Sequence, residues 1–435
     1  MSYIILSTPV NTLLSAGNDN YYTVSGTTIG APNVFDYKYI ADIYINGILQ
    51  VTLKSFPDPD FNIGVFNTRN IITSFLGVDF FPTWDTANIF QQCPNSACDV
   101  DIVFGEEYVS GTTFIQNRNI TDTGNRYINA SIPFPEYVNI AMDATYLPQG
   151  QTNISYLEYP IFGLGPTGLE TGFVYDMYSG QNKFLYFVNN PNDSDDDRGF
   201  SVIITTYDVN GNELGQYQFN NPFSAVESTG VQAVNCSYDF LNGVSSGAYT
   251  VLVGSAPIIT PDVASYKENV IGQSDISGWN AAFFYIKDNC GRTAPDSINV
   301  YWFNHLGGFD SWLFNKKNET TETKSVQKYK KIPGKLQSDG TFLTTTYDRS
   351  QQPFYTSLQD STVMFSDLLT DIDVLYLKYL VSSPVVFVQP NNDPGFMTAV
   401  TVEDNSYKIN KRVNQKIYSL QMTINQSYND YRQIL

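Results

Sequence analysis

Charge and histidine are both scarce in this chain of 435 residues. Lys, Arg, Asp and Glu together make up 15% of it, where about 25% is usual for a globular domain, and the only histidine is His305. A single imidazole excludes the metal sites that need several histidines. It leaves one candidate base, with no serine or cysteine nucleophile motif around it. The sequence therefore predicts no catalytic residue, no cofactor and no enzyme activity.

Cysteine is scarce as well, because four residues are too few for a disulfide scaffold. Cys93 and Cys98 can close a small loop or supply two metal ligands. Tetrahedral zinc needs two more ligands, and Cys236, Cys290 and His305 are all distant in sequence. We expect free, partly buried thiols and no metal.

Long apolar runs are also absent. Residues 1–6 have no basic segment followed by an apolar stretch, so no signal peptide is expected. No run approaches the roughly 20 apolar residues of a membrane span. We expect a protein made in a cytoplasm, without a membrane partner.

Aromatic residues are plentiful, with 31 tyrosines and 29 phenylalanines. Aromatic side chains fit the half-buried surface of a sheet, so the fold class is predicted as mainly β, with two or three β-sandwich modules of immunoglobulin or fibronectin type. Asn46-Gly47 and Asn210-Gly211 each stand between two alternating apolar runs, which predicts two β-hairpins. A short helix is expected after Asn67-Thr68. We place the modules at residues 1–150, 151–278 and 279–435.

The last module contains an aromatic hairpin over 300–314, folded about Gly307-Gly308, and a lysine-rich arm over 316–335. A helix is expected from Ser366, as its cap, to Leu380, with Ser383-Pro384 as its stop. Strands are expected over 385–388, 397–402 and 416–424. The residues predicted at an interface are the large aromatics of the hairpin and the lysines that follow it: Trp302, Phe309, Trp312, Lys316, Lys317, Lys324, Lys328, Lys330 and Lys331.

Charge is divided unevenly along the chain. Residues 1–286 contain 8 basic and 28 acidic residues, a net −20, whereas residues 287–435 contain 16 basic and 15 acidic residues, a net +1. The acidic part should repel nucleic acid and anionic membranes. We therefore expect the lysine-rich arm to contact an acidic neighbouring subunit, and we expect no nucleic-acid partner.

Four motifs resemble binding or catalytic sites, but we do not interpret them as functional. Residues 163–168 match G-x-G-x-x-G, but Pro166 and the strand-like sequence after it argue against a dinucleotide site. Residues 193–199 resemble a cation loop without the distal Glu of an EF-hand. The carboxylate pairs Glu106-Glu107 and Asp99 with Asp101 are of the kind that glycosidases use, but surface charge is the favoured interpretation for both.

Three parts of the chain together resemble a known group of proteins. They are the hairpin over 39–47 with Phe56-Pro57-Asp58-Pro59, the segment 104–108 (FGEEY), and residues 300–314 with their lysine-rich sequel and the basic ending over 411–432. The combination resembles uncharacterised virion structural proteins of tailed bacteriophages, especially those infecting Bacteroidota. The resemblance implies no catalytic residue. The last module is also similar in outline to tail-tube and distal-tail folds.

The resemblance implies a structural component of the virion, in the tail or in the head-to-tail neck, assembled as a homo-oligomeric ring with other virion proteins as neighbours. An alternative is a receptor-binding or carbohydrate-binding adhesin or spike, in which exposed aromatics stack on sugars and Glu106 or Glu107 acts as acid or base. A capsid-decorating protein is a third possibility.

Overall fold

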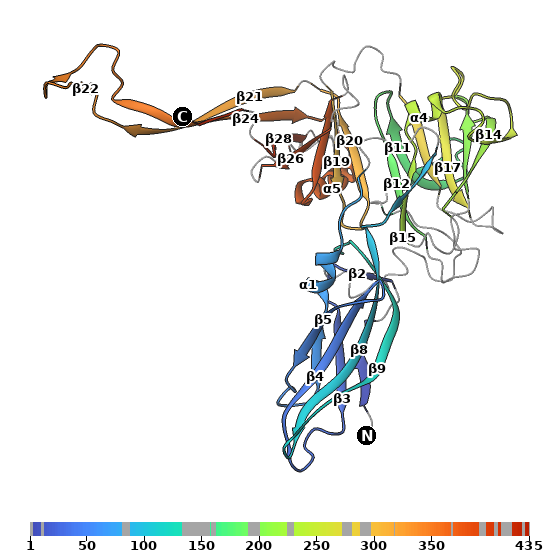
Figure 1. Cartoon of the computed structure of the whole chain (residues 1–435). Helices are drawn as coiled ribbons and strands as arrows, with labels where there is room; N and C mark the ends of the chain where they lie inside the picture. The colour runs from blue at the N-terminus through green and yellow to red at the C-terminus, as the bar shows by residue number, and fades with distance from the viewer. Residues whose placement is uncertain are drawn as a thin grey trace. The chain divides into compact units, whose positions relative to one another are not determined.

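The computed structural model describes most of the chain, in two compact units. The described residues are 3–9, 13–80, 88–132, 157, 162–189, 201–223, 230–271, 281–287, 297–316, 318–366, 369–390, 397–403, 408–409, 420–428 and 431–434. Unit 1 comprises Met1–Asp288 and Phe303–Asp310; unit 2 comprises Asn289–Trp302 and Ser311–Leu435. The fold is mainly β, as the aromatic-rich composition predicts (Figure 1). The division into three modules stays a prediction.

The N-terminal part of unit 1 has two sheets that share one core. Its five-stranded sheet has the order β2 (Leu13–Ser15), β9 (Thr113–Ile128), β8 (Ala97–Ser110), β4 (Val34–Ile45) and β5 (Ile48–Ser55). Its three-stranded sheet has the order β1 (Tyr3–Ser7), β3 (Tyr21–Gly26) and β6 (Gly64–Asn67). The rings of Tyr22 and Phe66, from the small sheet, lie 5.6 and 5.9 Å from that of Phe104 on β8. Aromatic side chains thus form much of this core, since each can bury a large apolar area.

Both Asn-Gly hairpins are confirmed. Asn46 and Gly47 have positive φ angles of 49° and 76°, and β4 and β5 pair as far as Ile45 and Ile48. Such a turn matches the twist of the flanking strands. The short helix after Thr68 is also present, as α1 (Arg69–Ile72) followed by the 3₁₀ helix η1 (Thr73–Phe75).

The second part of unit 1 again has two sheets and one core. The seven-stranded sheet has the order β10 (Phe162–Leu164), β11 (Thr171–Met177), β18 (Ala282–Ile286), β17 (Ser265–Ile271), β13 (Ser201–Tyr207), β14 (Glu213–Asn220) and β16 (Thr250–Val253). The three-stranded sheet contains β12 (Phe184–Asn189), β15 (Gly230–Asn235) and β7 (Phe90–Cys93), and one short helix, α4, spans Tyr238–Gly243. Residues 165–170 form the loop between β10 and β11, so the glycine-rich motif opens no helix; the motif over 193–199 lies outside the described residues.

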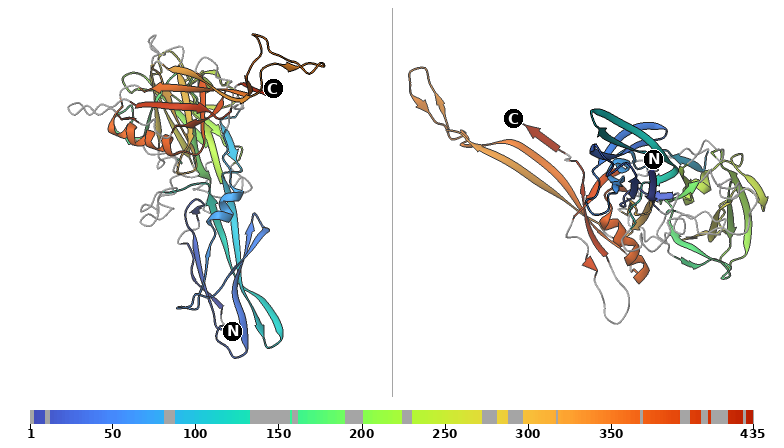
Figure 2. Two further views of the ribbon diagram at one scale, coloured as in Figure 1. Left: turned by 90° about the vertical axis from the view of Figure 1, so that its left-hand side faces the viewer. Right: turned by 90° about the horizontal axis from the view of Figure 1, so that it is seen from below.

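Unit 2 is built on one nine-stranded sheet (Figure 2). Its main path is β20 (Phe309–Phe314), β19 (Ile298–Phe303), β25 (Val386–Pro390), β26 (Thr398–Val402), β28 (Leu420–Gln426), β24 (Gln351–Phe365) and β21 (Glu319–Lys330). Two strands lie off this path, β27 (Lys408–Ile409) beside β28 and β29 (Tyr431–Ile434) beside β24. A small hairpin, β22 (Lys335–Leu336) and β23 (Phe342–Leu343), stands between β21 and β24 in the sequence. The strands predicted over 385–388 and 397–402 are confirmed.

The helix of unit 2, α5 (Asp371–Ser382), begins later than predicted. Its cap is Thr370, whose hydroxyl accepts the Asp373 N–H while the Asp373 carboxylate accepts the Thr370 N–H. Ser366 instead joins the sheet, because its hydroxyl accepts the Leu420 N–H at 2.8 Å. The start at Ser366 was therefore wrong, whereas the predicted stop at Ser383-Pro384 is confirmed.

Candidate interaction surface

The lysine-rich stretch of the sequence forms strand β21, which pairs antiparallel with β24 from Glu319 and Val363 to Lys330 and Gln351. We call residues 319–365 the arm and residues 331–350 the arm tip. The other partners of β24, which are β29 and β28, pair with it only over residues 355–358 and 361–365. Among the described strands, β21 and the first residues of β24 therefore pair only with each other (Figure 1).

The arm has no core of its own. From residue 319 to residue 356, every described side chain is exposed or half-buried, and none is buried. A two-stranded hairpin is marginally stable in water unless its apolar face is covered. The arm's stability therefore depends on its local hydrogen bonds and on whatever covers it.

Side chains hold the turns of the arm tip in place of a core. The Asp339 carboxylate accepts the Thr341 hydroxyl at 2.6 Å and the Thr341 N–H at 2.9 Å. The Asp348 carboxylate accepts the Thr345 N–H at 2.6 Å and its hydroxyl at 2.9 Å. These hydrogen bonds lower the pKa of both carboxyl groups, because they stabilise the charged form. The tip therefore has a defined shape that local polar contacts maintain.

Large apolar side chains are exposed on the arm tip. Ile332 is 75% exposed, Leu336 65%, Phe342 48%, Leu343 52% and Tyr347 82%. At the base of the tip, the partly exposed rings of Tyr329 and Phe354 lie 6.4 Å apart. A gathering of this kind on a monomer marks an interaction site more often than a free surface.

The tip and the strand ends that carry it are cationic. Residues 324–349 contain six basic residues and two acidic ones. Among the described residues, no ion pair involves Lys324, Lys328, Lys330 or Lys335. The arm tip thus presents apolar and positively charged groups together, which suits a partner that is apolar at its centre and acidic at its rim.

The predicted interface residues fall into two groups. Lys316, Lys324, Lys328, Lys330 and Lys331 are exposed on β21 or beside it, and Lys317 lies outside the described residues. Sequence reasoning missed the apolar tip. Its signal in the sequence is four large apolar residues inside a polar and basic stretch: Ile332, Leu336, Phe342 and Leu343. They lie next to, or between, Pro333-Gly334 and the Asp339-Gly340 turn.

The aromatic members of the prediction are engaged within the chain. In unit 2, Trp302 is fully buried, and Tyr376 of α5 lies 5.0 Å from its ring and 6.1 Å from that of the half-buried Trp312. In unit 1, Phe309 is buried against Phe80, with 4.8 Å between ring centres. Trp302 and Phe309 therefore offer no side-chain surface to another subunit in this fold, so any part that they play in an interface is indirect.

The turn of the aromatic hairpin belongs to unit 1, and its two glycines are needed for different reasons. Gly307 has a φ angle of +100°, as the predicted bend requires. Gly308 lies so close to the chain that an added Cβ would stand 2.5 Å from the Leu157 carbonyl oxygen. Burial lowers the pKa of the neighbouring His305 to about 4, so its imidazole is neutral at pH 7. The turn is a packing element of unit 1.

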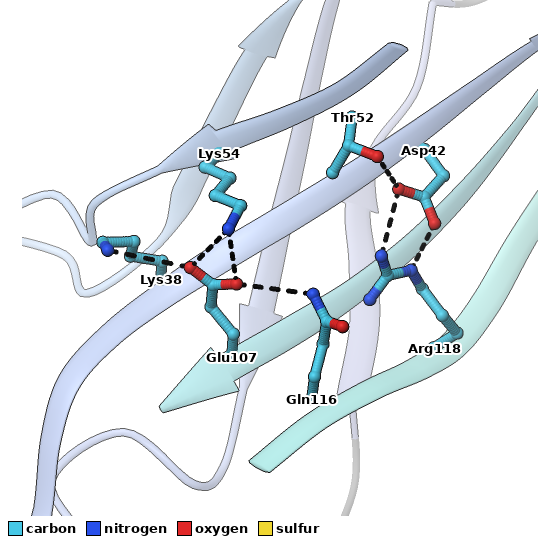
Figure 3. Close-up of polar contacts among 7 residues, drawn as sticks. All are labelled: Lys38, Asp42, Thr52, Lys54, Glu107, Gln116 and Arg118. Carbon is cyan, nitrogen blue, oxygen red and sulfur yellow. Dashed lines mark hydrogen bonds and ion pairs between the residues drawn. The ribbon is translucent and has the colours of Figure 1, made fainter. Parts of the chain in front are cut away.

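A network of ion pairs covers the outer face of the five-stranded sheet (Figure 3). The Lys54 ammonium donates to both oxygens of Glu107, at 2.8 and 3.0 Å, and the Lys38 ammonium lies 3.7 Å from the same carboxylate. Gln116 donates to it as well, at 3.4 Å. The Glu107 side chain is only 4% exposed. Partners on three strands therefore compensate this carboxylate, as a buried charge requires.

A second ion pair lies beside the first. The Asp42 carboxylate accepts hydrogen bonds from the Arg118 guanidinium and, at 2.6 Å, from the Thr52 hydroxyl. Gly105 lies on β8, between β4, which carries Asp42, and β9, which carries Arg118. At this point the pairing of β8 with β9 changes register. A Cβ on Gly105 would stand 2.0 Å from the Asn117 carbonyl oxygen. The sheet thus needs a glycine at this point of the network.

Glu106 and Glu107 are not surface charges and do not form a catalytic pair. Successive residues of a strand point to opposite faces of its sheet. Glu107 lies in the outer network, whereas Glu106 is buried on the core side, where it accepts the Tyr37 hydroxyl at 2.6 Å and the Thr28 hydroxyl at 3.1 Å. Both the surface-charge interpretation and a shared acid-base site are therefore wrong for this pair.

The remaining candidates have structural partners. The Asp99 carboxylate receives two hydrogen bonds from the Arg126 guanidinium, at 2.8 and 3.0 Å, and Asp101 accepts the Gly124 N–H. Cys93, Cys98 and Cys236 are buried free thiols, and burial raises the pKa of Cys98 to about 12. The described part of the chain contains no group of three or more His, Cys, Asp or Glu side chains suited to a metal.

The described residues offer little else that could bind a ligand or a membrane. A shallow hollow of about 270 Å³ is lined by Asn88, Ile89, Phe219, Asn220, Pro222 and Ala248, with no charged or nucleophilic group. Among the helices of the described residues, none is long and apolar enough to cross a membrane. No protein-family model and no curated protein matches the sequence. The arm is therefore the strongest candidate for a functional surface.

Proposed function

We propose that this chain is a structural subunit that assembles with copies of itself into a ring, held by the arm, in the tail or neck of a tailed-phage virion. One observation carries the proposal. The arm has no buried side chain between residues 319 and 356, yet its tip exposes five large apolar side chains within a cationic segment. Such a surface is stable and soluble when another molecule covers it.

The charge distribution favours a second copy as that molecule. Residues 1–286 carry a net −20, and the tip-bearing segment 324–349 carries a net +4. When the basic projection of one copy contacts the acidic body of another, the contact is heterologous. Repetition of such a contact closes a ring when the rotation between successive subunits allows it. The placement in a phage virion rests on the sequence resemblance. We further propose that the sheet pairs of unit 1 are sandwich modules and that unit 2 is of the tail-tube type.

The test is the oligomeric state of the purified chain with and without its tip. Replacing residues 331–350 by Asn-Gly joins Lys330 to Gln351, which already pair, through a two-residue turn. We expect rings from the native chain in electron microscopy and mass photometry, and monomers with unchanged thermal unfolding from the shortened chain. A native chain that stays monomeric at every concentration and is absent from purified particles would overturn the proposal.

One observation favours the alternative of a carbohydrate-binding adhesin. The N-terminal part of unit 1 exposes five phenylalanines that can stack on sugars, namely Phe35, Phe56, Phe61, Phe75 and Phe114. The acid-base role that this alternative gives to Glu106 or Glu107 has no support, because both side chains are buried and each is held by structural partners. Glycan-array binding that is lost on changing Phe56 and Phe61 to Ala would favour the adhesin. Location of the chain on the capsid surface would favour a decorating protein instead.

A further inference from the structure

Strand β16 (Thr250–Val253) is an edge that lacks the usual protection. It pairs with β14 on one side, through Gln216, Tyr217 and Gln218, and no described strand pairs with its other side. All four of its residues are exposed, including Val251, Leu252 and Val253. Edge strands generally carry a lysine, a proline or an inward-pointing charge that blocks pairing with another chain. β16 has none of these, so its backbone and apolar side chains are open to an added strand.

The segment of the chain that supplies this edge and its neighbouring strands is acidic. Residues 199–266, which supply β13, β14, β15 and β16, contain no lysine or arginine and five acidic residues. Two of the five, Asp208 and Glu213, flank the turn between β13 and β14. Leu214, next to Glu213, is close to the end of β16, since a Cβ on Gly254 would stand 2.7 Å from the Leu214 carbonyl oxygen. An acidic rim therefore lies beside the apolar edge.

The apolar character continues around the rim. Val209, in the same turn, is 85% exposed, and Leu214 is 37% exposed. The turn itself is held rigidly, because the Asp208 carboxylate accepts the N–H groups of Asn210 and Asn212 at 2.8 Å each. A hydrogen bond from the Asn212 side chain, together with these two, lowers the pKa of Asp208, so it is charged at neutral pH. The surface is thus preformed, with its charge fixed.

The arm tip is its chemical complement. It exposes Leu336, Phe342 and Leu343 on the small hairpin β22–β23, and its basic residues outnumber its acidic ones. β23 pairs only with β22 among the described strands, and the sequence Thr341–Thr346 is rich in residues that favour strands. In the chain itself the residues of both surfaces are exposed. The tip supplies positive charge and the β16 edge negative charge, and each exposes apolar side chains.

We propose that the arm tip of one copy docks on the β16 edge of unit 1 in a second copy, with β23 added beside β16 and the tip's lysines facing Asp208 and Glu213. This inference rests on the proposed self-assembly and names its receptor surface. Strand addition supplies main-chain hydrogen bonds, and the side chains at alternate positions supply specificity. Because each copy carries one tip and one edge, the contact is heterologous and propagates from copy to copy.

Complementary variants test the contact. An edge variant carries Glu213→Lys and Leu252→Lys; a tip variant carries Lys335→Glu and Leu343→Glu. All four side chains are exposed, so both variants should unfold like the native chain. Each variant alone should self-associate roughly 100-fold more weakly, because like charges now oppose one another in the contact. Mixed together, they retain one native tip and one native edge, so the mixture should recover the association that neither variant shows alone.

Asp60→Lys is the matched control, because it reverses one exposed acidic side chain in the N-terminal part of unit 1. It should leave assembly unchanged. If the native chain never assembles, the proposed function fails together with this inference. If removal of the tip blocks assembly but the edge variant still forms rings, or the mixture recovers no association, the β16 docking alone is overturned. The docking is likewise overturned if the edge variant forms rings but is not incorporated into particles, since another virion protein would then occupy the edge.

Discussion

Lysines serve opposite purposes on the N-terminal sheet and on the arm. On the sheet, Lys38 and Lys54 converge on one buried carboxylate, that of Glu107 (Figure 3). On the arm, Lys324, Lys328 and Lys330 stand on an exposed strand, and no described residue forms an ion pair with them. The sheet satisfies its charges internally, whereas the arm leaves charge and apolar surface together for a partner.

This difference shows why a count of charges is a poor guide to an interface. A face with many charged residues can satisfy its charges within the chain, as the Glu107 network does. A face with fewer charges is open when they have no partner and apolar side chains lie among them. Matched substitutions in the two regions measure this contrast directly.

The largest effect is expected from Gly105→Ala. The new Cβ would overlap the main-chain Asn117 oxygen in the middle of the sheet, and backbone atoms cannot move aside as a side chain can. We expect a loss of more than about 3 kcal/mol in the free energy of unfolding, beyond the usual cost of overpacking. Chemical denaturation followed by circular dichroism measures it.

Two glycines serve as controls for that substitution. An added Cβ on Gly334 of the arm would also clash, with Phe342 and Leu343, but the arm has no core to disrupt, so Gly334→Ala should leave global unfolding unchanged. Gly243→Ala meets no atom within 4 Å and should be neutral. A Gly105→Ala chain as stable as the native one would contradict our account of the register change.

The hairpins of the fold could be predicted, because Asn46-Gly47 and Asn210-Gly211 carry their turn chemistry in two adjacent residues. The start of α5 was misplaced for a physical reason. Ser366 and Thr370 are both good caps, but only Thr370 has an acidic residue three positions later to complete a capping box. Ser366 bonds to Leu420 instead, and such a long-range partner cannot be inferred from local sequence.

The candidate site was predicted only in part. A run of lysines is visible in a sequence, but whether each lysine has a partner depends on strands far away, as Lys54 and Glu107 illustrate. Likewise, Trp302 and Leu343 are both large apolar residues, and only the fold buries the first and exposes the second. The alternation of faces along β8, which separates Glu106 from Glu107, could have been inferred once a strand was assigned there.

The second-largest effect is expected from pH, through the buried titrating group His305. The exposed carboxylates of the arm are its counterpart. His305 has a pKa of about 4 in the folded chain and about 6.5 when unfolded, so the unfolded state binds more protons between these values. Stability should therefore fall as pH drops from 6.5 to 4, by an amount on the order of 3 kcal/mol at the acid end.

The measurement is the slope of unfolding free energy against pH for the native chain and for His305→Gln. The substitution should flatten that slope over this window, whatever it does to absolute stability. Asp339→Asn on the arm should leave the slope unchanged there, because the lowered pKa of Asp339 places its titration at more acidic pH. An unchanged slope in His305→Gln would show that the imidazole is not buried as described.

A smaller effect is expected from Glu107→Gln. The change removes the negative charge on which Lys38 and Lys54 converge, and we expect a loss of about 2 kcal/mol, below the full cost of breaking a buried pair because both lysines reach water. Combining it with Lys54→Gln should cost less than the sum of the two single changes, which a double-mutant cycle reveals. Glu322→Gln on the arm is the matched control and should be neutral. Additive losses would mean that the network is not coupled.

The smallest effect, and the sharpest contrast, is expected from lysines themselves. Lys328→Gln and Lys330→Gln on the arm should change the free energy of unfolding by less than about 0.5 kcal/mol, as exposed positions without partners do. Lys54→Gln, the same change on the sheet, should cost about 1 kcal/mol or more, because it withdraws two hydrogen bonds from a buried carboxylate. Assembly should show the reverse order, impaired by the arm changes and unaffected by Lys54→Gln. If the arm lysines prove as costly to unfolding as Lys54, they hold the fold together and are not free for a partner.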